Sequence, residues 1–119
     1  MMSAWDQEIF TEEVNEEFLD ELVELDDEEI IEAIQDACLL ALRQAGSISE
    51  DERRNGLAAA TIAAIWAGAP FTAGQVASDY PYIRELIGSG SEELSEAAAE
   101  LLESEETDAD LDQFIEALA

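Results

Sequence analysis

The sequence predicts an all-α protein, a single-domain irregular helical bundle of about six helices around a central alanine-rich helix at about residues 50–67. Apolar residues recur at three- and four-residue spacing along most of the chain, as on one face of a helix. No segment shows the alternating β-branched pattern of a strand. Residues 55–78 carry no charged side chain in an otherwise acidic sequence, and 119 residues suffice for one domain, 1–119.

The central helix is predicted from its ends and its composition. Ser49 followed by Glu52 forms a capping box at its start, and Gly68 with Pro70 ends it. The alanines between them favour a helix and let neighbouring backbones approach closely. Larger apolar side chains fill the remaining surface: Leu57, Ile62, Ile65 and Trp66. A helix that is apolar on nearly every side is a buried one, so we expect the other helices to pack around it.

The N-terminal region is expected to begin as an irregular aromatic arm over residues 1–10, pinned to the body by Trp5 and Phe10. Thr11 is a candidate N-cap for a first helix over about residues 12–25. The apolar stripe of this helix consists of Val14, Phe18, Leu22 and Leu25. Its other face is acidic: Glu13, Glu16, Glu17, Asp20, Glu21 and Glu24.

A second helix follows, with Asp26 or Asp27 as its cap. Its apolar face consists of Ile30, Ile34, Cys38 and Ala41. After the central helix, the composition of residues 68–80 changes to Gly, Pro, Thr, Ser and Gln, and we expect a loop there, with room for a short helical turn at 73–77.

Three shorter helices complete the prediction. Pro81 suits the first position of a helix over residues 82–87, Ser91 caps the next one, and Thr107 opens the last. Their apolar stripes include Leu94, Ala98, Leu101, Leu102, Leu111, Phe114, Ile115 and Leu118. Pairing of such helices through short connections gives a bundle.

The net charge and the missing residue types of the chain restrict the kinds of function that we expect. There are 31 Asp and Glu residues against 4 basic ones, all of them Arg, which gives a net charge of −27 with no His. Such a field repels nucleic acid and anionic membranes and attracts basic proteins. Without His there is no imidazole base or histidine metal ligand, and without Lys there is no Schiff base. We therefore expect no enzyme and no cofactor.

The compartment is predicted from three weaker features. Cys38 is the only cysteine, which excludes an intramolecular disulfide and suits a reducing compartment. The opening residues, MMSAWDQEIF, lack the basic and apolar regions of a secretory signal. The uncharged run is broken by Gly68 and Pro70 before it reaches the roughly 20 residues of a membrane span. We expect a cytoplasmic protein that does not bind membranes.

Two groups of reactive side chains are expected to be structural. Cys38 lies on an apolar stripe without a cation to form its thiolate, so we expect a core residue and no nucleophile. Arg53 and Arg54 follow three acids, residues 50–52, and local pairing with these acids is favoured over anion binding.

A calcium site is not expected, although Asp108, Asp110 and Asp112 have the spacing that begins a calcium loop. The loop requires Gly at its sixth position and Glu at its twelfth, where this chain has Gln113 and Ala119. We therefore predict no metal site.

The pattern leaves three hypotheses for function. The one we favour is a non-enzymatic protein-interaction module that binds a basic protein, as immunity proteins and nucleic-acid mimics do. Its acidic face would come from the first helix and from residues 92–106. The second is a small-molecule-binding protein or enzyme with an aromatic and carboxylate pocket near Trp5, Trp66, Tyr80 and Tyr82. The third is that the acidity is only an adaptation to salt or for solubility. The oligomeric state is left open.

Two stretches resemble a known family. MSAWDQEIF, residues 2–10, has a Trp and a Phe five positions apart, and GLAAATIAAIWAGAP, residues 56–70, is an alanine-rich helix that ends in Gly and Pro. Together they are similar to domain of unknown function family 4259, whose members open Met-Gly-x-Trp-Gly. Ser3 and Asp6 stand here in place of the two glycines. The resemblance implies a small helical domain and supplies no catalytic residue.

Overall fold

The central helix of the fold is α4 (Glu50–Trp66), in which every residue from Gly56 to Trp66 is buried. The computed structural model describes residues 5–44, 46–69, 74–105 and 111–118. The capping box is present: Ser49 Oγ accepts a hydrogen bond from the Glu52 N–H at 3.2 Å, and the Ser49 N–H donates to Glu52 Oε1 at 3.3 Å. The prediction of a buried central helix is confirmed.

The end of α4 is a Schellman motif built on Gly68. The Ala69 N–H donates to Ala64 O, and the Gly68 N–H donates to Ile65 O, both at 3.0 Å. Gly68 has a φ of 110°, which side chains with a Cβ rarely adopt, so glycine closes this turn without strain. The sequence prediction that the helix stops at Gly68 is therefore correct for a specific geometric reason.

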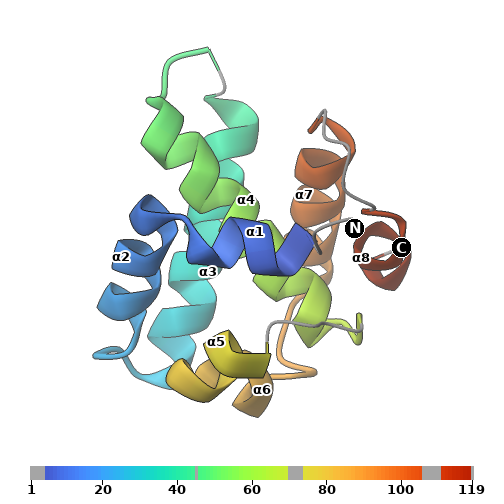
Figure 1. Ribbon diagram of the computed structural model, residues 1–119. Helices are drawn as coiled ribbons and strands as arrows, with labels where there is room; N and C mark the ends of the chain where they lie inside the picture. Colours follow the sequence, from blue (N-terminus) through green and yellow to red (C-terminus); the bar gives the residue numbers. More distant parts are fainter. Residues whose placement is uncertain (1–4, 45, 70–73, 106–110, 119) are drawn as a thin grey trace, which may run out of the picture.

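The N-terminal segment differs from the prediction. A helix, α1 (Trp5–Thr11), occupies the part that the sequence predicts as an irregular arm, so that prediction is wrong over residues 5–10. Trp5 and Ile9 lie one helical turn apart, both are buried, and α1 contacts α4 (Figure 1). Seven residues are too few for a helix that is stable alone, so packing against α4 stabilises α1.

The second helix, α2 (Glu13–Leu22), begins one residue later than predicted and ends earlier. Its N-cap is Glu12, which has an extended backbone and makes no side-chain capping bond. Thr11, the predicted cap, instead ends α1, where its hydroxyl donates to Gln7 O at 2.7 Å. The chain therefore turns between two helices at Glu12.

The most extensive helix contact in the described part of the chain joins α4 to α3 (Asp27–Arg43), whose predicted apolar face is buried. A Cβ atom at Gly56 would lie 2.3 Å from Ala41 Cβ and 3.1 Å from Ala37 O. Both neighbours belong to the α3 helix and cannot turn aside, so only glycine allows this approach. The small residues on both helices set the distance between them.

Four further helices complete the described part of the chain: α5 (Gly74–Asp79), α6 (Tyr82–Glu85), α7 (Glu92–Glu103) and α8 (Asp112–Leu118). The predicted loop at 68–80 is thus partly helical. The Ser91 hydroxyl accepts from the Leu94 N–H at 3.1 Å and caps α7 as expected. Figure 1 places α7 and α8 together on one side of α4, and both contact it.

Buried apolar residues from all eight described helices form one continuous cluster with α4 at its centre. The fold is therefore an all-α single globule, as the sequence predicts. Among the described residues, no helix combines the length and the apolar character needed to cross a membrane.

Candidate protein-interaction surfaces

The six acids predicted as a binding face all lie on the exposed side of α2 or directly after it. We call them the α2 acidic face: Glu13, Glu16, Glu17, Asp20, Glu21 and Glu24. The opposite side of α2 buries Asn15, Leu19 and Leu22. In the described part of the chain, none of the six acids takes part in an ion pair. The face therefore presents six exposed carboxylates to solvent.

Two tyrosines hold α2 in place. The Tyr82 hydroxyl donates to Leu19 O at 3.0 Å, and the Tyr80 hydroxyl donates to Asp20 Oδ1 at 2.5 Å. Their ring centroids are 6.1 Å apart. Burial raises the pKa of both hydroxyls, for Tyr80 to about 12, where the hydrogen bond to Asp20 adds to the effect. Both tyrosines are therefore neutral donors at physiological pH.

The four aromatics of the predicted pocket lie in different settings. Trp5 and Trp66 are buried, with 4 % and 1 % of their surfaces exposed, and belong to the main core. Trp5 Nε1 donates to Thr61 Oγ1 at 2.8 Å, while Trp66 Nε1 has no hydrogen-bond partner among the described atoms. Tyr82 is buried and Tyr80 is half-buried. The structure thus brings the two tyrosines together and uses the tryptophans as core.

Arg53 and Arg54 do not pair with the neighbouring acids, so the predicted local pairing is wrong. Arg54 forms a bidentate ion pair with Glu12. Its Nε donates to Glu12 Oε1 at 2.9 Å, and its Nη2 contacts Glu12 Oε2. Glu105 Oε2 lies 3.4 Å from Arg53 Nη2 and 3.7 Å from Arg54 Nη1. The hydrogen bond to Glu12 raises the pKa of Arg54 further above its ordinary value. These contacts join the α1–α2 turn, α4 and the end of α7.

No side-chain cluster with a reactive arrangement is found in the described residues. Cys38 is fully buried, and burial raises the pKa of its thiol to about 12, which opposes formation of a thiolate. Within the same residues, no group of three or more acids or cysteines could hold a metal ion. Asp108 and Asp110 lie outside the described residues, and Asp112 is the first residue of α8.

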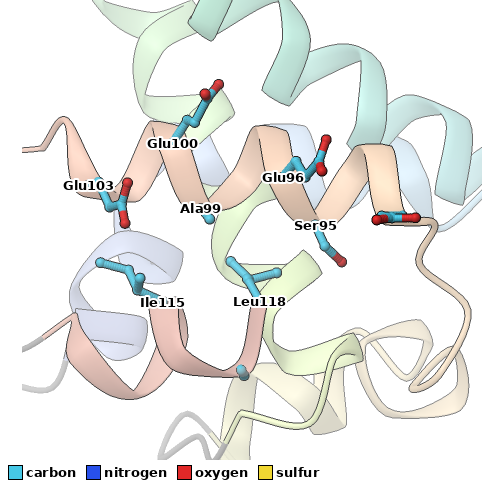
Figure 2. Close-up of a pocket in the computed structure, with 9 residues that line it drawn as sticks. Ser95, Glu96, Ala99, Glu100, Glu103, Ile115 and Leu118 are labelled. Carbon is cyan, nitrogen blue, oxygen red and sulfur yellow. The ribbon is translucent and has the colours of Figure 1, made fainter.

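A surface hollow of about 790 Å³ lies between α7 and α8 (Figure 2). We call it the α7–α8 groove, and its lining residues are Glu92, Ser95, Glu96, Ala99, Glu100, Glu103, Ile115, Ala117 and Leu118. In Figure 2, Ser95, Ala99 and Glu103 lie on the side of α7 that faces α8, and Glu96 and Glu100 point away from α8. The groove therefore combines apolar side chains of α7 and α8 with glutamates of α7, of which Glu103 lies on the α8-facing side.

A smaller hollow of about 540 Å³ lies at the turn between α2 and α3 and is lined by residues 25–29. Neither hollow is lined by Trp5, Trp66, Tyr80 or Tyr82. Sequence reasoning identified the acids of α7 but not the groove. The four glutamates that line the α7–α8 groove recur at three- and four-residue spacing, which is visible in the sequence. The concave shape of the groove depends on where α8 packs, which the sequence does not show.

Comparison with known proteins identifies one family. A family model described as a domain of unknown function, DUF4259, matches residues 3–118. Searches of curated proteins and of solved structures return no significant match. The match covers nearly the whole chain and confirms the resemblance carried by the N-terminal aromatics and the alanine-rich helix. The chain therefore belongs to the DUF4259 family.

Proposed function

We propose that the protein is a non-enzymatic interaction module that binds a basic protein through the α2 acidic face. The observation that carries this proposal is the exposure of six carboxylates on one side of one helix without an ion-pair partner among the described residues. Like charges at i, i+4 spacing destabilise a helix by a few tenths of a kcal/mol per pair. A basic partner would remove that repulsion and gain attraction.

The α2 acidic face is held rigidly enough to serve as a recognition surface. Leu19 and Leu22 anchor the helix in the core, and Tyr82 bonds to its backbone. A fixed array of charges loses little conformational freedom on binding and steers a partner of opposite charge during encounter. The mode of action is therefore that of an immunity protein or a nucleic-acid mimic, whose partner is a cationic protein.

The proposal and a simple adaptation to salt differ in which acidic residues they require. Among the described residues, Arg53 and Arg54 form ion pairs with Glu12 and Glu105, and none of the six acids takes part in one. An adaptation needs only net charge, so any set of exposed acids would be equivalent. An interaction face requires that the α2 acids matter more than the same number of acids elsewhere.

The test compares two variants with equal net charge. One carries Glu13→Gln, Glu16→Gln, Glu17→Gln and Glu21→Gln, which keeps Asp20 and its bond to Tyr80. The matched control changes four exposed acids of α3, Glu28, Glu29, Glu32 and Asp36, to their amides. A basic protein captured at low salt from the source cells is purified, and its affinity for each variant is measured by calorimetry.

We expect salt-dependent binding that the α2 variant weakens by roughly tenfold or more, while the α3 control changes it by less than about threefold. An equal loss of affinity in both variants would show that net charge alone determines binding, and it would overturn the proposed binding face. Failure to capture any basic protein at low salt would overturn the function itself.

A further inference from the structure

The α7–α8 groove differs from the other acidic surfaces because apolar side chains lie beside its carboxylates. Ala99, Ile115 and Ala117 are half-buried, although they neighbour the core, and they line the groove. The core-facing side of α7 is already covered, since Leu94, Ala98 and Leu101 are buried. The groove thus leaves an apolar strip of α7 and α8 in contact with solvent.

The carboxylates beside this strip form a regular row. Glu92, Glu96 and Glu100 are spaced at i, i+4, Glu103 follows three residues later on the side that faces α8, and all four are exposed. Residues four apart on a helix lie about 6 Å from one another, and the row extends along about 16 Å of helix axis. A second helix laid beside α7 would present its own i, i+4 positions with the same repeat.

We propose that the α7–α8 groove binds one amphipathic basic helix of another protein. This helix spans about three turns and places apolar side chains on Ala99, Ile115 and Ala117, with Lys or Arg residues at i, i+4 facing Glu96 and Glu100. The inference rests on the proposed function for the basic character of the partner. It adds a second surface and the secondary structure of the segment that this surface recognises.

Charge complementarity selects this occupant over other classes. The charged side chains that line the groove are all glutamates, so an anionic ligand is repelled. A second copy of the chain, at a net charge of −27, is repelled for the same reason. A polyamine would satisfy the carboxylates but would leave the apolar strip uncovered. Only a helix with both a basic and an apolar side matches both halves of the groove.

The test uses the full chain and a labelled synthetic peptide of about 14 residues, long enough for nearly four turns. The peptide contains Leu, Ala and Lys arranged so that lysines at i, i+4 adjoin a stripe of leucines. The matched peptide has the same composition in scrambled order. Binding is measured by fluorescence anisotropy, and helix formation on binding by circular dichroism.

Three protein variants locate the contact. Glu96→Gln with Glu100→Gln removes the acidic side of the groove, and Glu32→Gln with Asp36→Asn is the control with equal charge and spacing on α3. Ala99→Arg places a bulky cation on the apolar strip. Thermal unfolding verifies that each variant keeps the wild-type fold, and if Ala99→Arg fails to fold, Ser95→Arg at the neighbouring groove position replaces it.

We expect the patterned peptide to become helical on binding and to bind at least roughly tenfold tighter than the scrambled peptide. Glu96→Gln with Glu100→Gln should weaken binding of the patterned peptide roughly fivefold. The α3 control should change the affinity by less than about twofold. Ala99→Arg should weaken it by tenfold or more. Equal affinity of the two peptides, or equal weakening by the two charge variants, would overturn the inference. Competition by spermidine at equal charge concentration would also overturn it, because the apolar strip would then contribute nothing.

The outcomes separate this inference from the proposed function. If the captured basic protein binds and depends on the α2 acidic face, but the patterned peptide binds no better than the scrambled one, only the groove inference fails. If the peptide binds through the groove and no basic protein is captured, the groove stands and the proposed α2 function fails.

Discussion

Trp5 Nε1 donates a hydrogen bond of 2.8 Å to Thr61 Oγ1, and this bond fixes α1 to the middle of α4 across 56 positions of sequence. The Thr61 hydroxyl donates a hydrogen bond to Leu57 O at 2.8 Å, so it both donates and accepts. Asn15, the other fully buried polar residue described, donates to Ile9 O at 2.7 Å. Thr61 and Asn15 therefore both hold α1 in place.

Removing either partner of the Trp5–Thr61 bond should destabilise the fold. Trp5→Phe and Thr61→Val are each expected to lower the free energy of unfolding by about 1–3 kcal/mol, because each leaves a buried polar atom unpaired or a space unfilled. In a double-mutant cycle measured by urea unfolding, we expect a coupling energy of about 1 kcal/mol. Trp66→Phe is the control, since its indole N–H has no described partner, and it should be additive with Thr61→Val. Zero coupling between Trp5 and Thr61 would contradict the assignment.

Gly56 should tolerate no side chain. Gly56→Ala places a methyl group 2.3 Å from Ala41 Cβ, which forces α3 and α4 apart, and we expect a loss of about 1–3 kcal/mol despite the higher helix propensity of alanine. Gly46→Ala is the control, because a Cβ there meets nothing within 4 Å. Both are measured by thermal unfolding, and a neutral or stabilising Gly56→Ala would show that the helices are packed differently.

The central helix was predictable because its determinants are local. Ser49 and Glu52 are three positions apart, Gly68 follows the last apolar turn, and the alanines between them make the helix apolar all round. Gly56 also carried a readable signal, since a glycine inside a helical pattern often marks a close helix contact. What the sequence did not contain was the identity of the helix that approaches it.

The unpredicted features depend on contacts between distant segments. α1 has only seven residues, too few to form a stable helix alone, so its length does not distinguish it from an irregular arm. Arg54 had acids adjacent in sequence, yet its partner is Glu12, 42 positions away, because α4 directs the side chain toward the α1–α2 turn. The α7–α8 groove likewise exists only through the packing position of α8.

The contact between Arg54 and Glu12 should contribute more stability than that between Arg53 and Glu105. Arg54 binds Glu12 through two groups, whereas Arg53 has one contact at 3.4 Å, and both side chains are partly exposed. Arg54→Met should lower stability by about 1–2 kcal/mol and Arg53→Met by less than about 1 kcal/mol. Arg54→Lys should recover only part of the loss, since an ammonium cannot make the paired contact. Thermal unfolding is the measurement, and equal effects of the two Met variants would contradict this ranking.

The protein should lose stability in alkali. The pKa of Tyr80 is raised from 10.0 to about 12 in the folded state, the pKa of Tyr82 is also raised, and that of Cys38 is raised from 9.0 to about 12. Below the unfolded-state values these groups are protonated in both states and stability is complete. As pH rises from about 9 through about 12, the unfolded chain releases protons that the folded chain retains, which favours unfolding.

Tyrosinate absorbance and helical circular dichroism, recorded on the same samples, test this linkage. We expect tyrosinate to appear together with the loss of helix, well above pH 10.0. Tyr80→Phe is expected to reduce the alkaline sensitivity, because it removes one of the linked protons. Ionisation of both tyrosines near their ordinary pKa while the helices remain intact would contradict the burial described here.

The position of α4 in mid-sequence has a consequence for synthesis on the ribosome. α1, α2 and α3 precede α4 in the chain, whereas α7 and α8 follow it, and all five contact it. While the nascent chain grows, the side of α4 that later meets α7 lacks its cover and is open to adhesion between chains. The carboxylates of α2 and α3 emerge earlier and repel other copies at this stage. We therefore expect the high acidity to limit aggregation of the unfinished chain, apart from any role in the finished molecule.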